Sequence, residues 1–496
     1  MTNTVAKVDP ENPSVRYIFF GLAALGLLMS SIDSTIVAVA IPALTTSLDT
    51  SLNWVGWTMT GYQLTQVVVM PLIGRLSDEL GRKRVFMFCI GSFTIGSLLC
   101  ALAPNIGFLI LFRVIQALGG GGLMPSAVGI VSDQFKDRRM QAIGLFSSIF
   151  PIGGIIGPNL GGWIIQNWSW REIFTINLPI GLVVLVGAQL VLRAKRQTVE
   201  RQPIDFLGLA LYAGAMLALM YAMTAAGTDP TALRSPLIWL LVIGSLLLFV
   251  LFIRQERRTD HPIVEIQLLA RMPFLPANIY NFVYGIAVLG LLSFVPYFAV
   301  VQYHMSTVQS GAVLTPRSLA LTAVAAVYSL FILRAGYRKP MVAGTLIVGL
   351  SLALLGQGWS RANLGPLELD GFWLMAVEVA IAGVGMGLAT PAANNASIDM
   401  LPGRAAAITG LRGMFRITGG IMGVSTTVLV LSFFPDQAAG MRTLFFVVAL
   451  VLQLTIPLIL LIPDSARERR RWQAAGTEGM PEQSPGKVVA IKGKSQ

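Results

Sequence analysis

The sequence predicts an all-α polytopic membrane protein whose chain crosses the bilayer fourteen times. Of its 496 residues, 54% are hydrophobic and only 12% are charged, and the mean hydropathy is +0.71. Soluble domains are about half apolar and about one-quarter charged, so this composition is typical of a membrane protein. The apolar residues form about fourteen runs, each near the 20 residues that a helix needs to span the hydrocarbon core.

The first six runs form the N-terminal half of the predicted bundle. The first run is a full span without an early small-residue cleavage site, so we expect a retained helix and not a signal peptide. Glycine and proline interrupt several runs, which neighbouring helices can compensate. A cytoplasmic segment at 1–16 precedes the half at 17–193, whose helices are expected at 17–41, 53–75, 84–104, 107–131, 139–165 and 171–193.

A weak internal repeat relates the first six runs to the last six. The stretch GRK at 81–83 resembles GYRK at 336–339, at an offset near 255 residues. Transporters are often built from such repeats. The predicted plan is therefore six, two and six: an inserted pair at 205–255 (helices 205–227 and 235–255), a C-terminal half at 276–463 (helices 276–301, 309–334, 340–358, 371–396, 404–431 and 441–463) and a basic tail at 464–496.

Basic residues predict the orientation. With a cytoplasmic N-terminus, the even-numbered connections and both tails hold about 28 of the 36 lysines and arginines, as the positive-inside rule requires. Both termini are therefore expected on the cytoplasmic side of the plasma or inner membrane, and the net charge of +12 reflects topology. We interpret the basic tail as an anchor near anionic lipid headgroups and not as a nucleic-acid arm.

The chain offers no metal, nucleotide or nucleophile constellation that supports an enzyme. Cys89 and Cys100 lie eleven residues apart on one predicted helix, which is about 16 Å and too far for a disulfide, so free thiols are expected. His304 has no second histidine or cysteine nearby, and His261 lies in a charged loop. We therefore expect no metal site.

Charged side chains inside the predicted spans are the candidate functional residues, because ionisable groups are costly there. Gln116 follows Arg113 by three residues, so the two side chains point from one helical face. Counted at 1.5 Å per residue from the predicted outer ends, Asp33 lies about 12 Å deep, Arg113 about 9 Å, Arg317 about 12 Å and Glu378 about 10 Å.

Two interpretations of these charges remain open. Carboxylates and guanidinium groups in one pocket can exchange a proton for an organic cation, because both compete for the same negative charge. Alternatively, Asp33 and Arg113 form a permanent salt bridge that only neutralises both, while Glu378 faces a neighbouring helix.

The stretch GRLSDELGRKR at 74–84 contains glycines for a tight turn, Gly74 and Gly81. Asp78 near a helix C-terminus needs a cationic partner such as Arg82. The stretch resembles the G-x-L-x-D-x-x-G-R-K signature of the major facilitator superfamily, which implies that Asp78 and Arg82 close a cytoplasmic gate. A turn that only fixes topology is the alternative.

Two further motifs are similar to patterns of the same superfamily. LFRVIQALGGGG at 111–122 resembles its fourth-helix R-x-x-Q-G-x-G pattern, with Ala117 in place of the first glycine. GGIIGPNLGG at 153–162 resembles the fifth-helix G-x-x-x-G-P-x-x-G-G pattern of antiporters, which implies exchange, unless it is only a packing motif. Its small residues and proline are Gly153, Gly157, Pro158, Gly161 and Gly162.

The segments IDSTIVAVAIP (32–42) and WREIFTINLPIG (170–181) resemble those of fourteen-span drug:proton antiporters. The first-helix pattern of that family, D-x-T-x-x-N-x-A-L-P, has Asn and Leu where this chain has Ala38 and Ile41. In the superfamily's plan, the helices that carry Asp33, Arg113 and Glu378 line the central cavity.

The resemblance implies a proton-driven exporter of amphipathic organic compounds that works by alternating access. Its expected partners are a small-molecule substrate, protons and membrane lipids, with no nucleic acid and no cofactor beyond the proton gradient, and a monomer is expected. The main alternative is a lipid or glycolipid translocase on the same fold, in which Arg113 and Arg317 bind a headgroup phosphate. A membrane sensor is a third alternative.

Overall fold

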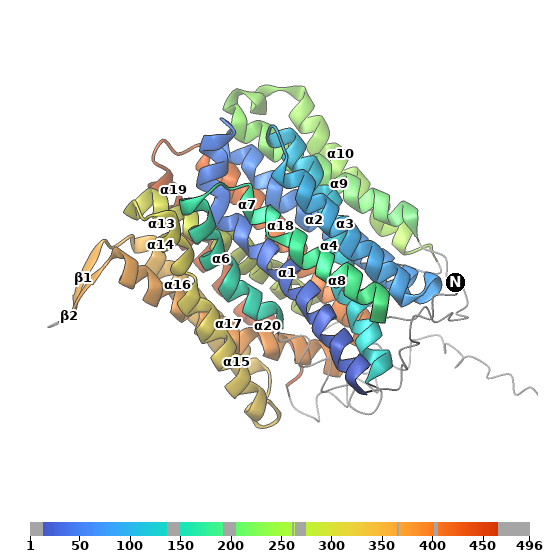
Figure 1. The fold of residues 1–496 in the computed structure, drawn as a ribbon. Coiled ribbons are helices and arrows are strands. Elements are labelled where there is room, and N and C mark those ends of the chain that lie inside the picture. Colours follow the sequence, from blue (N-terminus) through green and yellow to red (C-terminus); the bar gives the residue numbers. More distant parts are fainter. Residues whose placement is uncertain are drawn as a thin grey trace, which may run out of the picture.

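The protein is a helical bundle with one short β-hairpin at its edge (Figure 1). In this computed structural model, β1 (Arg361–Leu364) and β2 (Leu367–Asp370) pair antiparallel, with Arg361 opposite Asp370. The structure describes residues 13–135, 149–191, 205–259, 262, 274–364, 367–400 and 405–464. The basic tail and most of the N-terminal segment lie outside these ranges.

The N-terminal half contains six helical segments, the last of which is broken after its first turn. The first helix begins at residue 13, four residues before the predicted start. The start of the predicted fifth helix, at 139, lies outside the described residues. The helices are α1 (Pro13–Ser47), α2 (Leu52–Leu80), α3 (Arg82–Ala101), α4 (Ile106–Gln134), α6 (Ile149–Asn167), α7 (Glu172–Thr175) and α8 (Asn177–Val191).

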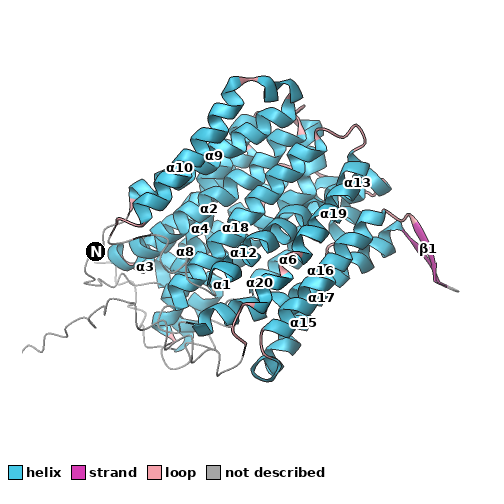
Figure 2. Ribbon diagram, turned by 180° about the vertical axis from the view of Figure 1, so that it is seen from behind, coloured by secondary structure: helices cyan, strands magenta, loops and turns pink. Residues whose placement is uncertain are grey.

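The inserted pair follows as two antiparallel helices along one side of the bundle (Figure 2). Asp229 caps a short connecting turn by accepting from the Thr231 backbone N–H (2.9 Å). The elements are α9 (Phe206–Thr228), η2 (Pro230–Arg234) and α10 (Pro236–Glu256).

The C-terminal half again contains six helical segments, three of them interrupted. In its first segment, main-chain atoms of Gly285 and Gly290 lie so close to α18 that a Cβ would come within 2.1 Å of Arg416 O and 2.6 Å of Gly423 Cα. The segments are α12–η3–η4–α13 (Phe274–Gly285, Ile286–Gly290, Leu291–Phe294, Val295–Tyr303), α14–α15 (Thr307–Ala312, Thr315–Ala335), α16 (Arg338–Gln357), α17 (Gly371–Met400), α18 (Ala405–Leu431) and α19–α20 (Gln437–Gln453, Ile456–Leu460).

These fourteen segments coincide with the fourteen predicted spans, so the all-α, six-two-six prediction is confirmed. Twelve of the helices in the described ranges are long and apolar enough to cross a membrane on their own. The other two are α2, which carries Gln63 and Gln66, and the glycine-rich α6. Cys89 and Cys100 are buried free thiols, as predicted.

The two halves meet along two seams, α2 with α18 and α6 with α14 and α15. Asn159 Nδ2 donates to Thr315 Oγ1 (2.6 Å) across the second seam, and Ser318 Oγ donates to Gly154 O (3.2 Å). These contacts lie in the half of the bundle that the positive-inside rule predicts to be outer.

Helix α9 lies beside the first seam and bonds to both halves. Trp57 Nε1 on α2 donates to Thr224 Oγ1 on α9 (2.6 Å). Nearer the predicted inner end, the hydroxyl oxygens of Tyr212 on α9 and Thr418 on α18 lie 2.6 Å apart. The inserted pair is therefore packed against both halves of the bundle.

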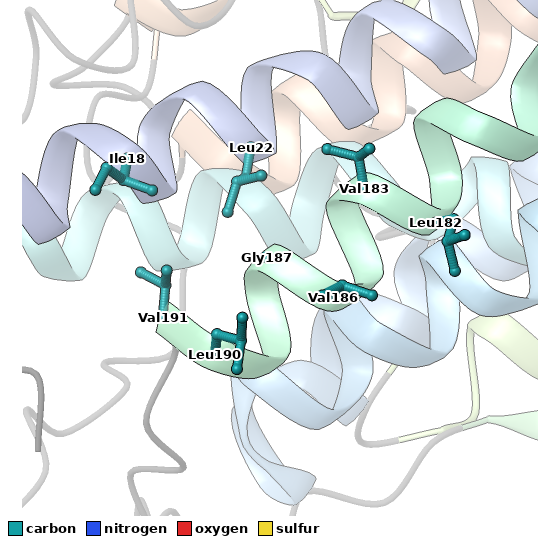
Figure 3. A pocket seen from close by; sticks show the side chains of 8 residues that line it. All are labelled: Ile18, Leu22, Leu182, Val183, Val186, Gly187, Leu190 and Val191. Carbon is teal, nitrogen blue, oxygen red and sulfur yellow. The ribbon is translucent and has the colours of Figure 1, made fainter. Parts of the chain in front are cut away.

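An apolar groove of about 470 Å³ lies between α1 and α8 (Figure 3). Four of its α8 side chains are exposed, and no charged side chain lines it. In a membrane this surface faces lipid, so the groove is not a polar binding site. It is lined by Ile18, Leu22, Leu182, Val183, Val186, Gly187, Leu190 and Val191.

Candidate functional site

The centre of the N-terminal half holds a buried ion pair between two helices. Arg113 Nη1 on α4 donates to Asp33 Oδ2 on α1 across 2.6 Å. Asp33 is 0% and Arg113 1% exposed, so neither charge is accessible in this state. A buried pair of this kind is maintained only when further hydrogen bonds satisfy both groups.

Neutral side chains supply those hydrogen bonds. Gln116 Nε2 donates to Asp33 Oδ1 (2.8 Å), and its Oε1 accepts from Arg113 Nη1 (2.5 Å). Asn177 Nδ2 on α8 also donates to Asp33 Oδ1 (3.2 Å). Ser97 Oγ on α3 lies 2.7 Å from the Gln116 amide nitrogen and 3.2 Å from that of Asn177. We call Asp33, Arg113, Gln116, Asn177 and Ser97 the Asp33 network.

Arg113 is also held by groups that carry no charge. Its Nε donates to the main-chain oxygen of Thr58 on α2 (3.1 Å). Its guanidinium carbon lies 4.0 Å from the centre of the Tyr62 ring and 5.7 Å from that of Phe174. Cation–π contacts of this kind strengthen when water is excluded.

Glycines allow α3 and α4 to approach closely enough to form the network. A Cβ at Gly96 would lie 2.5 Å from Gln116 Cα, and one at Gly119 would lie 2.2 Å from Cys89 O. Real Cβ atoms essentially never approach other atoms so closely. The glycines at these positions therefore set the separation at which Gln116 reaches Ser97.

Chemically, the Asp33 network contains a carboxyl, which is a group that exists in an ionised and a protonated form. Protonation of Asp33 would leave Arg113 without its counter-ion, which is strongly unfavourable for a buried group. Because the network joins α1, α3, α4 and α8, any such change acts on four helices at once.

Arg317 and Glu378 are not joined to the Asp33 network by any hydrogen bond or ion pair among the described residues. Arg317 lies on α15, where its main-chain oxygen would be 2.2 Å from a Cβ at Gly383 of α17. Glu378 lies on α17 and is 4% exposed. The structure thus brings together three of the five predicted coupling or substrate residues.

A family model described as Major Facilitator Superfamily matches residues 23–333, which is more than half of the chain. The chain belongs to the major facilitator superfamily.

Its helical plan agrees with solved members of the fold. The peptide transporter POT in complex with sulfate has a TM-score of 0.66 at 14% identity, covering 93% of this chain and 96% of its own. The xylose transporter XylE from E. coli, in an inward open conformation, has a TM-score of 0.62 at 12% identity, covering 93% of this chain and 99% of its own.

Curated members of the superfamily are similar over most of this chain. Multidrug resistance protein 3 of Bacillus subtilis is 31% identical over 421 residues, which are 84% of this chain and 77% of the relative. Multidrug resistance protein B homolog of Mycobacterium tuberculosis is 29% identical over 83% of this chain and 76% of its own. The Tetracenomycin C resistance and export protein of Streptomyces glaucescens is 28% identical over 84% and 77%.

The superfamily signature at 74–84 comprises the end of α2, the connection at Gly81 and the first residues of α3. Gly81 has a φ of 94°, and Gly336, its counterpart in the repeat, has a φ of 70°, a region that favours glycine. A Cβ at Gly129 of α4 would lie 2.6 Å from Arg82 Nη1, so this guanidinium reaches α4. A Cβ at Gly74 would meet no atom within 4 Å. The Asp78 side chain lies outside the described residues, so the gate stays a prediction.

The fifth-helix motif of this major facilitator contacts both α1 and the opposite half. Three glycines of the motif lie against α1. A Cβ at Gly153 would come within 2.4 Å of Ser31, one at Gly157 within 2.4 Å of Thr35, and one at Gly161 within 2.4 Å of Ile36. A Cβ at Gly162 would lie 2.5 Å from Thr307 O, and one at Gly311 2.1 Å from Pro158 O. The motif therefore serves close packing within the N-terminal half and at the seam with α14.

Sequence reasoning missed Asn177 and Ser97 as members of the site. Asn177 and Ser97 are uncharged polar residues inside apolar runs, and both are at most 1% exposed. Buried polar groups in a membrane must be satisfied internally. The position of these polar residues within predicted spans was the feature of the sequence that indicates buried hydrogen-bonding partners.

Proposed function

We propose that this major facilitator exports amphipathic organic compounds, drugs among them, in exchange for protons. The observation that carries the proposal is the Asp33 network, an ionisable carboxyl held at the junction of four membrane helices. Two of the three curated relatives are named as multidrug resistance proteins, and the third as a tetracenomycin C resistance and export protein. These names support an organic cargo.

The proposed coupling acts through charge. A proton on Asp33 removes the negative partner of Arg113, and Gln116 and Asn177 lose their anionic acceptor. The guanidinium then needs a new arrangement, because an uncompensated buried charge is strongly destabilising. A cargo that binds one of the two arrangements more tightly shifts the equilibrium between them, which is the basis of exchange.

Alternating access requires the halves to separate on one side at a time. The contacts of Asn159 with Thr315 and of Ser318 with Gly154 join the halves at the predicted outer side. We infer that these contacts break when the cavity opens outward. The gate residues Asp78 and Arg82 would then close the inner side.

The lipid or glycolipid translocase is the second candidate. It requires Arg113 and Arg317 to bind one phosphate group. Arg113 is engaged by Asp33 and by Gln116, and no described hydrogen bond or ion pair joins Arg317 to the Asp33 network. This arrangement favours the organic exporter.

We further propose that the protein works as a monomer in the plasma or inner membrane, with both termini cytoplasmic. Protons and the surrounding lipids are then its partners besides the cargo. A reporter fused after Gln496 tests the orientation, and external activity of that reporter would contradict it.

Proton release from purified protein tests the proposed exchange. In weakly buffered detergent solution, adding a transported compound should acidify the medium. In proteoliposomes, an imposed pH gradient should drive movement of the same compound, and collapsing the gradient should stop it. Movement that is independent of the gradient would contradict proton exchange, and preferential movement of a fluorescent phospholipid would favour the translocase.

A further inference from the structure

Glu378 forms a second buried polar site, in the C-terminal half. It is 4% exposed, and its Oε2 has no hydrogen-bond partner among the residues that the structure describes. Its main-chain oxygen accepts from Ser351 Oγ on α16 (2.6 Å). A carboxyl without a counter-ion inside a membrane is either protonated or matched by a bound cation.

Tyr303, the last residue of α13, packs on the face of α17 that carries Glu378. Gly371 and Glu378 are seven residues apart, which is close to two helical turns, so they share this face. A Cβ at Gly371 would lie 2.6 Å from Tyr303 Cδ1. Tyr303 Oη is also a buried atom without a described hydrogen-bond partner. Glu378 and Arg442 are the charged groups that interact electrostatically with Tyr303.

We propose that Glu378 takes up a proton from the predicted outer side through the hydroxyl of Tyr303, at a site separate from the Asp33 network. A hydronium ion at the outer side gives a proton to Tyr303 Oη while Tyr303 Oη gives its own proton to a carboxylate oxygen of Glu378. Water and a neutral tyrosine remain, so the net change is one proton gained by Glu378. A tyrosine hydroxyl can both donate and accept, as this step requires. The inference rests on the proposed proton exchange and names Glu378 as a second group that carries a proton, besides Asp33.

The chain geometry places Tyr303 at the boundary with the predicted outer surface. The next residue, His304, is exposed and left-handed, with a φ of 52°. A positive φ is uncommon for a residue with a side chain and ends α13 abruptly. Tyr303 therefore lies between an exposed turn and a buried carboxyl.

The helices packed against α17 bring no counter-ion to Glu378. Its neighbour α16 contributes the Ser351 hydroxyl, which bonds to the main chain. Arg317 on α15 packs against α17 nearer the predicted inner end, at Gly383. Arg412 on α18 bonds to Asn394, four turns further along α17. Tyr284 on α12 contacts Thr390 (3.1 Å). None of these groups forms an ion pair with Glu378 within the described ranges.

Dicyclohexylcarbodiimide tests this assignment without any cargo, because it reacts with protonated carboxyls in apolar surroundings. We expect peptide mapping by mass spectrometry to find an adduct on Glu378 whose yield falls as the pH is raised. Glu378→Gln should abolish the adduct, and Glu378→Asp should retain it. Tyr303→Phe should move the pH midpoint of labelling. The matched control is Glu172→Gln. Its carboxyl is not buried and lies at the predicted outer end of its membrane span. This variant should change neither the adduct on Glu378 nor the pH midpoint of labelling.

An adduct on Asp33 instead of Glu378, or a Glu378 yield that does not depend on pH, would overturn the inference. Measuring proton release on cargo addition distinguishes failure of the Glu378 inference from failure of the proposed proton exchange. If release is absent while Glu378 still labels with pH, proton exchange fails. If release persists undiminished in well-folded Glu378→Gln protein, Glu378 is not the carrier.

Discussion

Asn177 on α8 donates a hydrogen bond to Asp33 on α1, with 3.2 Å between Nδ2 and Oδ1. The same nitrogen lies 3.2 Å from Ser97 Oγ, so this uncharged amide links three helices at one point. No water in the hydrocarbon core can replace such a partner. Asn177 is therefore one of the neutral groups that satisfy the carboxylate of the buried ion pair.

Asn177→Ala should lower the free energy of unfolding by about 1 to 3 kcal/mol, because it leaves buried acceptors with fewer donors. Thermal unfolding in detergent measures the effect. Asn167→Ala is the control, since Asn167 is exposed and donates to Trp163 O in its own helix (2.8 Å). Equal melting temperatures for the two variants would contradict the assigned role.

Gly119→Ala should destabilise the α3–α4 contact by about 1 to 3 kcal/mol, the usual range for overpacking a close-packed site. The added Cβ would lie 2.2 Å from Cys89 O, a main-chain atom that has little freedom to move. Gly91→Ala is a matched control on α3, because a Cβ there meets no atom within 4 Å. A Gly119→Ala protein as stable as the Gly91→Ala protein would show that the helices can separate without cost.

The helical plan was predictable because membrane spans must satisfy their backbone hydrogen bonds internally, which restricts each apolar run to a helix. The pairing of Asp33 with Arg113 was predictable in kind, since buried charges are usually paired. The breaks near Gly285 and Gly290 depend on contacts with α18, a helix more than a hundred residues away. Sequence periodicity contains no information about such contacts.

The partners of the ion pair were less predictable than the pair itself. Asn177 and Ser97 carry no charge and match no motif, and they join the site only because α3, α4 and α8 pack together. Conversely, Glu378 was grouped with Asp33 because of its depth and because its helix was expected to line the central cavity. Neither criterion specifies a direction around the helix, and no described hydrogen bond or ion pair joins Glu378 to the Asp33 network.

Tyr212→Phe should cost about 1 kcal/mol of stability, the usual value of one hydrogen bond, because it removes the 2.6 Å contact with Thr418 between α9 and α18. Thermal unfolding again provides the measurement. Tyr221→Phe on the same helix is the control, because Tyr221 is 46% exposed. If both variants unfold alike, the hydroxyl of Tyr212 does not link the inserted pair to the C-terminal half.

Asp78→Asn should reduce transport while cargo binding persists, because the predicted gate lies away from the Asp33 network. Equilibrium binding and proteoliposome transport of one fluorescent cargo measure the two properties separately. Arg84→Gln is the control, since Arg84 is an exposed charge in the same turn. Loss of binding together with transport would show that Asp78 does not act as a gate residue.

Asp33→Asn should abolish proton-driven export, because the amide keeps the shape of the side chain but carries no titratable charge. Asp33→Glu should retain part of it, since the carboxyl is displaced by only about one methylene.

The Asn variant also leaves Arg113 buried without a counter-ion, which typically costs 3 to 5 kcal/mol, so misfolding is a competing explanation for lost export. The double variant Asp33→Asn/Arg113→Gln separates the two, because it removes both charges and should recover much of the lost stability while export stays absent. Membrane yield and melting temperature are therefore measured beside pH-driven efflux of a cationic dye. If the double variant is stable and still exports the dye at the parental rate, the ion pair has only a structural role. Glu378 is then the group to which proton coupling is assigned.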